Sequence, residues 1–191
     1  MNLRVLLTLP LLGLTMACTS DDGGGGGAAA ADGGGGATGA VIDESDGCGR
    51  AKREDDLQVI PLKAIADATL PETGFVVATT FLRITHGDAG AAVFSELETP
   101  VQGELVAAPG VLAVELAVAT SCNTARTLSV WESIEAMYGF VGGPAHATAM
   151  ERVAEVSRGG SVTTHWDATA ASEASWEEAL RRLSSVSGPV Y

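Results

Sequence analysis

The alternation of apolar and polar positions after residue 57 predicts a mixed domain of strands and helices. Apolar residues recur at helical spacing between about residues 88 and 108 and between 133 and 158. Four other segments are rich in β-branched and aromatic residues, which predicts strands. These predicted strands are 75–84, 111–120, 125–132 and 161–169, with a shorter leading strand at 57–60.

Breaks in the pattern refine the two predicted helices and add a third. Pro100 predicts a kink or a split in the first helix, because proline removes a backbone donor. Gly142 and Gly143 weaken the second helix, and Pro144 suits the first turn of a restarted segment. A capping box, Ser-Trp-Glu-Glu at 175–178, starts a C-terminal helix. The order βαββαβ plus an appended helix predicts an α+β fold of the ferredoxin-like, split βαβ type.

Both faces of the predicted strands carry enough apolar residues to be at least half buried. One layer of helices on a single sheet would cover only one of these faces. A second sheet, from another copy of the chain, would cover the other face, so the sequence predicts a homodimer. The pattern leaves open which face carries Trp131, at the end of the third main strand.

The first 18 residues have the pattern of an export signal. Arg4 supplies a basic start, Val5 to Leu14 form an apolar run, and the small residue Ala17 precedes Cys18. The run is too short to span a bilayer permanently. The segment resembles a bacterial lipoprotein signal peptide, in which Cys18 becomes the lipid-modified first residue, and Thr19 after it indicates the outer membrane. The alternative is an ordinary secretory signal in which Cys18 is incidental.

The chain therefore divides into three predicted parts. Residues 1–17 are the signal peptide, and residues 18–56 are a flexible tether with long glycine and alanine runs. Residues 57–191 are the folded domain. The expected location is outside the cytoplasm, with the domain anchored to the bacterial cell envelope through lipid on Cys18.

Charge and cysteine content limit the partners. The net charge is −13, and loss of residues 1–17, with one Arg and no acid, would make it −14. Nucleic acid is excluded as a partner, because its binding needs Lys and Arg to displace counterions. Export permits a disulfide, so Cys48 and Cys122 either form a bridge or remain two unrelated thiols. Their spacing predicts no metal site, which would need four converging ligands.

His146, just after the helix break, is the first candidate for chemistry. On a helical wheel it shares a face with Met150 and Val153, opposite Glu151 and Arg158. We therefore expect it to face the sheet. It is either a core histidine with one hydrogen bond to a backbone carbonyl, or a base, donor or iron ligand in a cavity beneath the helix. The paired glycines favour the second reading, since they remove side chains where a pocket mouth would open.

Trp131, at the strand end beside that helix, is the second candidate. It is either a core residue whose indole N–H finds a carbonyl, or the wall of a pocket. Further candidate pocket residues come from the first main strand and from both halves of the broken helix: Phe81, Arg83, Met137, Phe140 and Met150. The sequence contains no GxSxG, HExxH, CxxC, P-loop or dinucleotide motif.

The stretch TLSVWESIEAMYGFVGGPAHATAM, residues 127–150, resembles the central signature of the antibiotic biosynthesis monooxygenase-like superfamily. In that group a strand ending in Trp-Glu-Ser leads into a helix with an Ala-Met/aromatic-Phe pattern and a later His. The stretch APGVLAVEL at 108–116 also matches, and the resemblance covers about residues 74–170. It implies a dimeric α/β barrel, here with an appended C-terminal helix and one small apolar pocket in each subunit.

The resemblance also implies candidate activities. Some members of the superfamily oxygenate polycyclic phenols without a metal, and others bind and degrade haem. By resemblance, Trp131 occupies the position of a pocket tryptophan, and His146 matches a His of carotenoid-oxygenase-like and uncharacterised relatives. The haem-degrading His would fall near Phe140 or Val141, which cannot ligate iron. We therefore expect no cofactor, with haem at His146 left open.

Two functions fit these observations. The first is a monooxygenase-like enzyme acting on an apolar or aromatic small molecule, with His146 as base or haem ligand and Trp131 as pocket wall. The second is a non-catalytic ligand-binding or assembly domain of the cell envelope, in which the same residues are core. The expected exported location weighs against the first, because the usual aromatic substrates of such oxygenases are made in the cytoplasm.

Overall fold

The computed structural model describes residues 47–187 and residue 191. The elements in chain order are β1 (Gln58–Lys63), η1 (Ile65–Asp67), β2 (Phe75–Arg83), α1 (Asp88–Ala107), β3 (Val111–Ala119), β4 (Thr124–Trp131), α2 (Ile134–Val141), α3 (Pro144–Glu151), α4 (Val153–Val156), β5 (Val162–Ala168), η2 (Ala171–Glu173) and α5 (Trp176–Ser184). All predicted strands and helices are present, and the predicted α+β class is confirmed.

The strands form one sheet in the order β1-β3-β4-β2-β5. All four pairings are antiparallel. Without the leading strand β1, the order β3-β4-β2-β5 places the first and third main strands in the centre. This is the predicted ferredoxin-like arrangement.

Side-chain caps place two helices where the sequence predicts them. The Ser133 hydroxyl accepts a hydrogen bond from the backbone N–H of Ala136 at the start of α2. Ser175 accepts one from Glu178 at the start of α5. The predicted restart at Pro144 is also present, and the second predicted helix is divided into α2, α3 and α4.

Pro100 does not split α1, which runs unbroken over 20 residues. Both Pro100 and Glu96, four residues before it, are exposed. Water can therefore bond the carbonyl that a proline in a helix leaves without its usual donor. The expected split is wrong because the break falls on the solvent side of the helix.

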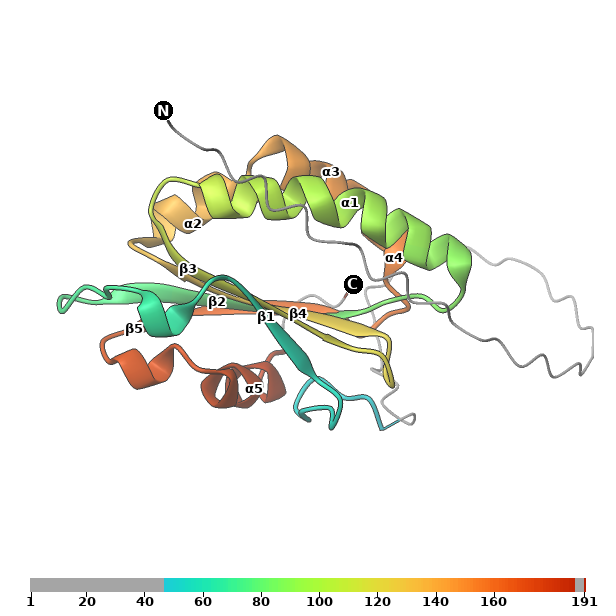
Figure 1. Cartoon of the computed structure of the whole chain (residues 1–191), viewed down its shortest axis with the longest axis horizontal. Helices are drawn as coiled ribbons and strands as arrows, with labels where there is room; N and C mark the ends of the chain where they lie inside the picture. The colour runs from blue at the N-terminus through green and yellow to red at the C-terminus, as the bar shows by residue number, and fades with distance from the viewer. Residues whose placement is uncertain (1–46, 188–190) are drawn as a thin grey trace, which may run out of the picture. The chain divides into compact units, whose positions relative to one another are not determined.

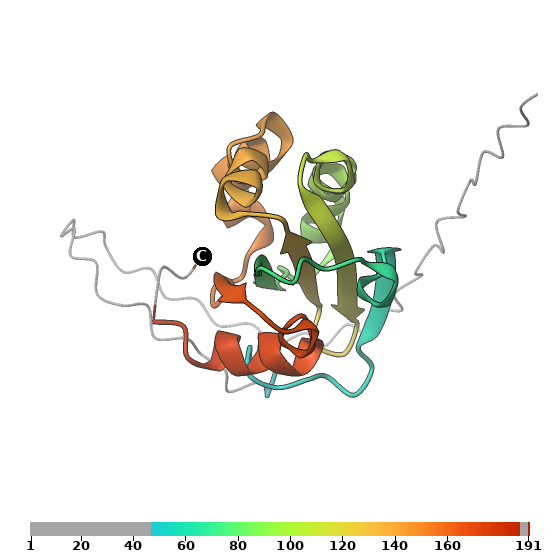
Figure 2. The same cartoon turned by 90° about the vertical axis from the view of Figure 1, so that its left-hand side faces the viewer.

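The helices divide between the two faces of the sheet (Figures 1 and 2). α1, α2, α3 and α4 lie over one face, which we call the helix side, and α5 lies over the other, the α5 side. On the α5 side Val77, Leu128 and Trp166 pack with Ala179 of α5 and with Ile65 of η1. The expectation that a second copy's sheet covers this face is wrong, because the chain's own appended helix fills that space. The homodimer itself stays a prediction.

Residues 47–56, assigned to the tether from their composition, pack on the domain. Cys48 forms a disulfide with Cys122, with Cα atoms 5.5 Å apart. The buried Glu54 carboxylate accepts from Arg126 Nε at 3.2 Å and from Arg126 Nη2 at 3.0 Å. The Nη groups of Arg126 also donate to the carbonyls of Gly49, Arg50 and Lys52. The boundary drawn at residue 57 is therefore wrong, because this segment folds around one guanidinium and has no periodic pattern.

The predicted signal peptide, the lipidation site Cys18 and the tether up to residue 46 lie outside the described residues. Among the described residues, no helix combines the length and the apolar character needed to cross a membrane.

Candidate functional site

Three aromatic side chains connect one end of the sheet to the start of α3. The ring of Trp131 stacks on Phe140 of α2, with ring centroids 5.6 Å apart. Phe140 meets His146 of α3 edge to face, with centroids 5.0 Å apart. The two residues predicted to be catalytic are therefore close, but Phe140 stands between them.

Trp131 is a core residue on the helix side. It is 1% exposed and packs with Val76, Val111 and Met137. Its indole N–H donates to the hydroxyl of Ser129, on the same strand, at 2.9 Å. The side chain therefore closes one end of the space between the helices and the sheet.

His146 is half-buried, and one of its ring nitrogens has a partner. Its Nδ1 lies 3.0 Å from the backbone oxygen of Val141. A carbonyl oxygen only accepts, so the neutral ring carries its proton on Nδ1 and keeps a lone pair on Nε2. This bond is the one expected of a structural histidine, and it also leaves Nε2 able to accept a proton.

Glu104 of α1 binds the start of α3. Its Oε2 accepts from the backbone N–H of Ala145 at 2.8 Å and from that of His146 at 3.2 Å. A carboxylate at a helix N-terminus is favourable. A Cβ on Gly143 would lie 2.0 Å from Glu104 Oε1, so this glycine makes room for the carboxylate. The expectation that Gly143 opens a pocket mouth is therefore wrong.

The five residues predicted to line a pocket do not lie together. Phe81 and Arg83 lie on the α5 side, where Phe81 packs with α5. Met137 and Phe140 lie on the helix side, against the sheet. Met150 is exposed on α3. A single pocket lined by all five is excluded.

The register of β2 and β4 explains this separation. Residues opposite each other share a face, and side chains alternate between faces along each strand. Trp131 lies opposite Val76, whereas Phe81 lies opposite Arg126, whose guanidinium carbon is 4.3 Å from the centre of the Phe81 ring. Alternation within one strand predicts that its side chains divide between two faces. It does not predict which side chains of the neighbouring strand share each face.

The two faces of the interior strands β2, β3 and β4 differ in burial. On the α5 side their side chains are buried along the whole length, except at Leu112 and Glu115. On the helix side they are buried near Trp131 but only half-buried farther along. We call this half-buried set the groove floor: Ala78, Thr80, Leu82, Leu116, Val118, Ala125 and Thr127. Because interior strands have no free edge, solvent reaches these side chains from beneath the helices.

Helices α1, α3 and α4 cover the groove floor. α1 packs on β3, while α3 and α4 pack mainly against α1 rather than the sheet; Figure 2 shows the helices side by side above the strands. At the end away from Trp131, the Thr85 N–H donates to the Val156 oxygen at 2.8 Å, and Ile84 pairs with Ser157. The groove floor thus lies between two ends where the helix layer is joined to the sheet.

The groove floor is apolar apart from two hydroxyl groups. Thr80 and Thr127 lie opposite each other on β2 and β4, and the other members are aliphatic. Such a lining suits a neutral, mainly apolar molecule with one or two hydrogen-bonding groups. Within residues 47–187 and 191, no three His, Cys, Asp or Glu side chains come together as a metal site. The contacts of the His146 ring, with the Val141 oxygen and the Phe140 ring, do not indicate haem binding.

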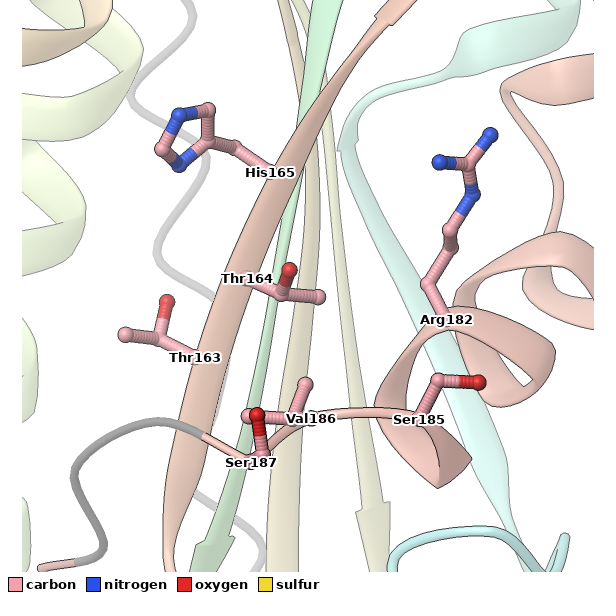
Figure 3. A pocket seen from close by; sticks show the side chains of 7 residues that line it. All are labelled: Thr163, Thr164, His165, Arg182, Ser185, Val186 and Ser187. Atoms are coloured by element: carbon pink, nitrogen blue, oxygen red, sulfur yellow. The ribbon is translucent and has the colours of Figure 1, made fainter.

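A separate shallow hollow of about 400 Å³ follows the outer edge of β5 (Figure 3). Its lining residues are Thr163, Thr164, His165, Arg182, Ser185, Val186 and Ser187. Tyr138 of α2 meets His165 edge to face, with ring centroids 5.9 Å apart. On the other side of the strand Arg182 pairs with Glu178. Arg181 and Arg182 lower the pKa of the Glu178 carboxyl to about 2.

Sequence reasoning missed Glu104, Arg126 and Glu54, which organise the start of α3 and the segment at 47–56. The side chain of each makes its contacts with residues at least 41 positions away. Their only sequence signal is an ionisable residue beside an apolar segment, which is common on any surface.

Comparisons with known proteins give matches only among solved structures. No family model and no curated protein matches the chain. A putative antibiotic biosynthesis monooxygenase from Caulobacter crescentus is 20% identical, over 50% of this chain and 90% of that one, with a TM-score of 0.43. SnoaB, a cofactor-independent oxygenase from Streptomyces nogalater, is 17% identical, over 51% and 93%, with a TM-score of 0.39. NE2512, a protein of unknown function from Nitrosomonas europaea, is 12% identical, over 52% and 94%, with a TM-score of 0.44. These are likenesses of fold at low identity, and none assigns an activity to this chain.

Proposed function

We propose that the domain binds an apolar small molecule on the groove floor, beneath α1, α3 and α4. The half-burial of Thr80, Leu82 and Leu116 on interior strands supports this most directly, since the same strands are buried on the α5 side. Protein interiors are normally packed to near-crystal density. A partly open apolar surface at the centre of a sheet is therefore a specific feature that a ligand would fill.

The lining indicates the class of ligand. A molecule with a rigid apolar body would lie against Leu82 and Leu116, with a hydroxyl or carbonyl group at Thr80 and Thr127. A charged group on this floor would lose its hydration without gaining an opposite charge, which is strongly unfavourable. We therefore expect neutral aromatic or polycyclic molecules to bind and their carboxylated analogues to bind more weakly.

Oxygenation of such a ligand is the second candidate function. The Nδ1 bond from His146 to Val141 favours it, because this bond leaves Nε2 free to act as a base. A base that removes a proton from an activated phenol would let the resulting carbanion react with molecular oxygen. In the non-catalytic alternative, a binding or assembly domain of the envelope, the same hydrogen bond only joins α3 to the end of α2.

We also infer that the protein is exported and held at the bacterial cell envelope, at the outer membrane, by lipid on Cys18. The Cys48–Cys122 disulfide supports export, because disulfides persist in oxidising compartments. Metabolic labelling of the expressed chain with palmitate is expected to mark the wild type and not Cys18→Ser. Equal labelling of the two would contradict the anchor.

The binding proposal is tested by titrating the full chain with N-phenyl-1-naphthylamine, a neutral probe that becomes fluorescent in apolar sites. Thr80→Phe fills the groove floor and is expected to abolish the signal. Thr99→Phe makes the same change on the exposed side of α1 and is expected to bind like the wild type. Absence of binding by the wild type, or equal binding by both variants, would overturn the proposal.

The oxygenase candidate needs a separate measurement. Oxygen uptake with an anthrone-type phenol is compared between the wild type and His146→Gln, with probe binding measured on both. Loss of uptake with unchanged probe binding would assign a base role to His146. Absence of uptake by a wild type that still binds the probe would leave the binding function alone.

A further inference from the structure

The two edge strands of the sheet differ in how they are protected. β1 carries Pro61, which has no backbone donor, and Lys63, and its register with β3 shifts between these two residues. Proline, lysine and irregular register are the usual means by which proteins block strand addition at an edge. β5 has none of them, and its seven pairs with β2 run from Val162 to Ala168 without a shift.

The direction of the backbone groups of β5 follows from the two ends of the strand. The Ser161 N–H and C=O bond to Tyr191 at 3.1 and 2.9 Å, away from β2. Beyond the other end, the Thr169 N–H donates to Glu173 Oε2 at 2.9 Å. Because backbone groups alternate in direction along an antiparallel strand, the odd-numbered residues between these ends also point outward. These are Thr163, His165 and Asp167, whose backbone groups have no backbone partner among the described residues.

The surface along this edge has the form that an added strand needs. Figure 3 shows His165 and Thr164 on opposite sides of β5, and both line the same hollow. A ligand that touches both sides lies along the edge, as a strand with alternating side chains does. Tyr138, 53% exposed and in contact with His165, adds an aromatic surface beside the edge.

We propose that a second copy of this chain adds its β5 antiparallel to the first β5, so that two sheets join edge to edge. Among the two-fold registers that place outward-pointing groups opposite each other, those centred on residue 164, 165 or 166 overlap most of the strand. The first brings Asp167 opposite Ser161, which already binds Tyr191, and the third brings Thr163 opposite Thr169, whose N–H already donates to Glu173, so each of these two loses its outer pair. The second sets His165 against itself. The register centred on Trp166 sets His165 against Asp167 of the second copy, twice by symmetry.

In this register, binding of the second copy depends on the side chains at positions 165 and 167. His165 and Asp167 are both exposed and lie on the helix side of the strand, so the paired side chains would meet on one face. An imidazole directly opposite a carboxylate can donate a hydrogen bond to it, whereas two directly opposed acidic side chains repel each other. This interface does not depend on a ligand at the groove floor. It places the expected dimer contact at the sheet edge rather than at the sheet face, which α5 covers.

The test is sedimentation equilibrium of the full chain and its variants. His165→Glu places a glutamate opposite Asp167 of the other copy, twice by symmetry. This repulsion is expected to weaken the dimer at least about tenfold. Combining it with Asp167→Arg restores opposite charges and is expected to restore the dimer. His86→Glu, the same substitution in the exposed loop between β2 and α1, is the control and is expected to leave the dimer unchanged.

Three results would overturn the proposal. One is a wild type that stays monomeric up to about 200 µM, a concentration at which even a weak pair of this kind should form. Another is a dimer that His165→Glu leaves intact, which would place the interface on another surface. The third is a double variant that dimerises no better than His165→Glu, provided that circular dichroism shows all variants folded.

Discussion

The α5 side and the helix side of the sheet are built from the same strands and yet differ in how fully they are covered. Val77, Leu128 and Val130 on the α5 side are fully buried. Thr80 and Leu82 of β2 and Leu116 of the neighbouring strand β3 are half-buried on the helix side. The α5 side meets one helix that lies directly on it, whereas the helix side meets a layer whose members pack largely on one another.

This difference separates stability from binding. A closed face contributes packing and apolar burial, whereas a partly open face leaves apolar surface for a ligand. The α5 side also carries the buried ion pair of Arg126 and Glu54. We therefore expect substitutions on the α5 side to act mainly on folding and those on the groove floor to act mainly on binding.

Arg126→Met is expected to have the largest effect. It leaves the buried Glu54 carboxylate without its positive partner and with only the Thr124 hydroxyl as a side-chain donor, which should lower the free energy of unfolding by about 3–5 kcal/mol. Arg152→Met, on the helix layer, removes a partly exposed guanidinium paired with Glu96 and Glu155 and should cost less than about 1 kcal/mol. Urea denaturation followed by circular dichroism measures both. Similar losses of unfolding free energy in the two variants would show that the buried Arg126–Glu54 pair stabilises the domain no more than the exposed pairs of Arg152.

The same substitution on the two faces sharpens the comparison. Leu128→Ala creates a cavity in the closed core of the α5 side and should cost about 3 kcal/mol. Leu116→Ala removes a side chain that is already half-exposed and should cost about 1 kcal/mol. Probe binding should show the reverse order, with the larger loss for Leu116→Ala. If both variants lost equal stability, the helix side would be as closed as the α5 side.

The smallest expected effect is a dependence of the domain's stability on pH in the acid range. The pKa of Glu178 on α5 is lowered to about 2 by Arg181 and Arg182, so its stabilising contribution is present above pH 4.5 and is lost as the pH falls toward 2. Glu178→Gln should remove this dependence, at a cost of under about 1 kcal/mol at neutral pH.

Glu98 on α1 is expected to give the opposite dependence of stability on pH. Burial raises the pKa of this carboxyl, so its contribution to stability improves as the pH falls through that raised value. Glu98→Gln should therefore reduce the gain on mild acidification, whereas Glu178→Gln reduces the loss in stronger acid. Urea midpoints measured between pH 2.5 and 7 would test both, and identical profiles for the two variants would contradict the assignment.

The fold was predictable because its signals are local. Ser133 and Ser175 cap the helices that follow them, Pro144 restarts a helix, and the strands are marked by their β-branched residues. The candidate site was predictable only in part. His146 and Trp131 do lie near each other, but Phe140 between them and Glu104 beneath His146 depend on contacts between distant elements.

The assignment of strand faces shows the same limit. Phe81 and Arg83 alternate with Thr80 and Leu82 in β2, and either set was a reasonable pocket lining from hydrophobicity alone. The choice depends on where α5 docks, and Leu183 of that helix packs on Phe81. A segment about 100 residues later in the chain therefore decides which side chains of β2 are open to a ligand.

The disulfide between Cys48 and Cys122 gives the domain a particular response to mechanical load. The two cysteines are 74 positions apart, and Cys122 lies in the turn between the interior strands β3 and β4. A pull on the chain ahead of Cys48 is therefore delivered to the middle of the sheet and bypasses the edge strand β1, which would otherwise peel away first. In the oxidised protein the covalent ring from Cys48 to Cys122 cannot be drawn out, so stretching can lengthen only the segments outside it.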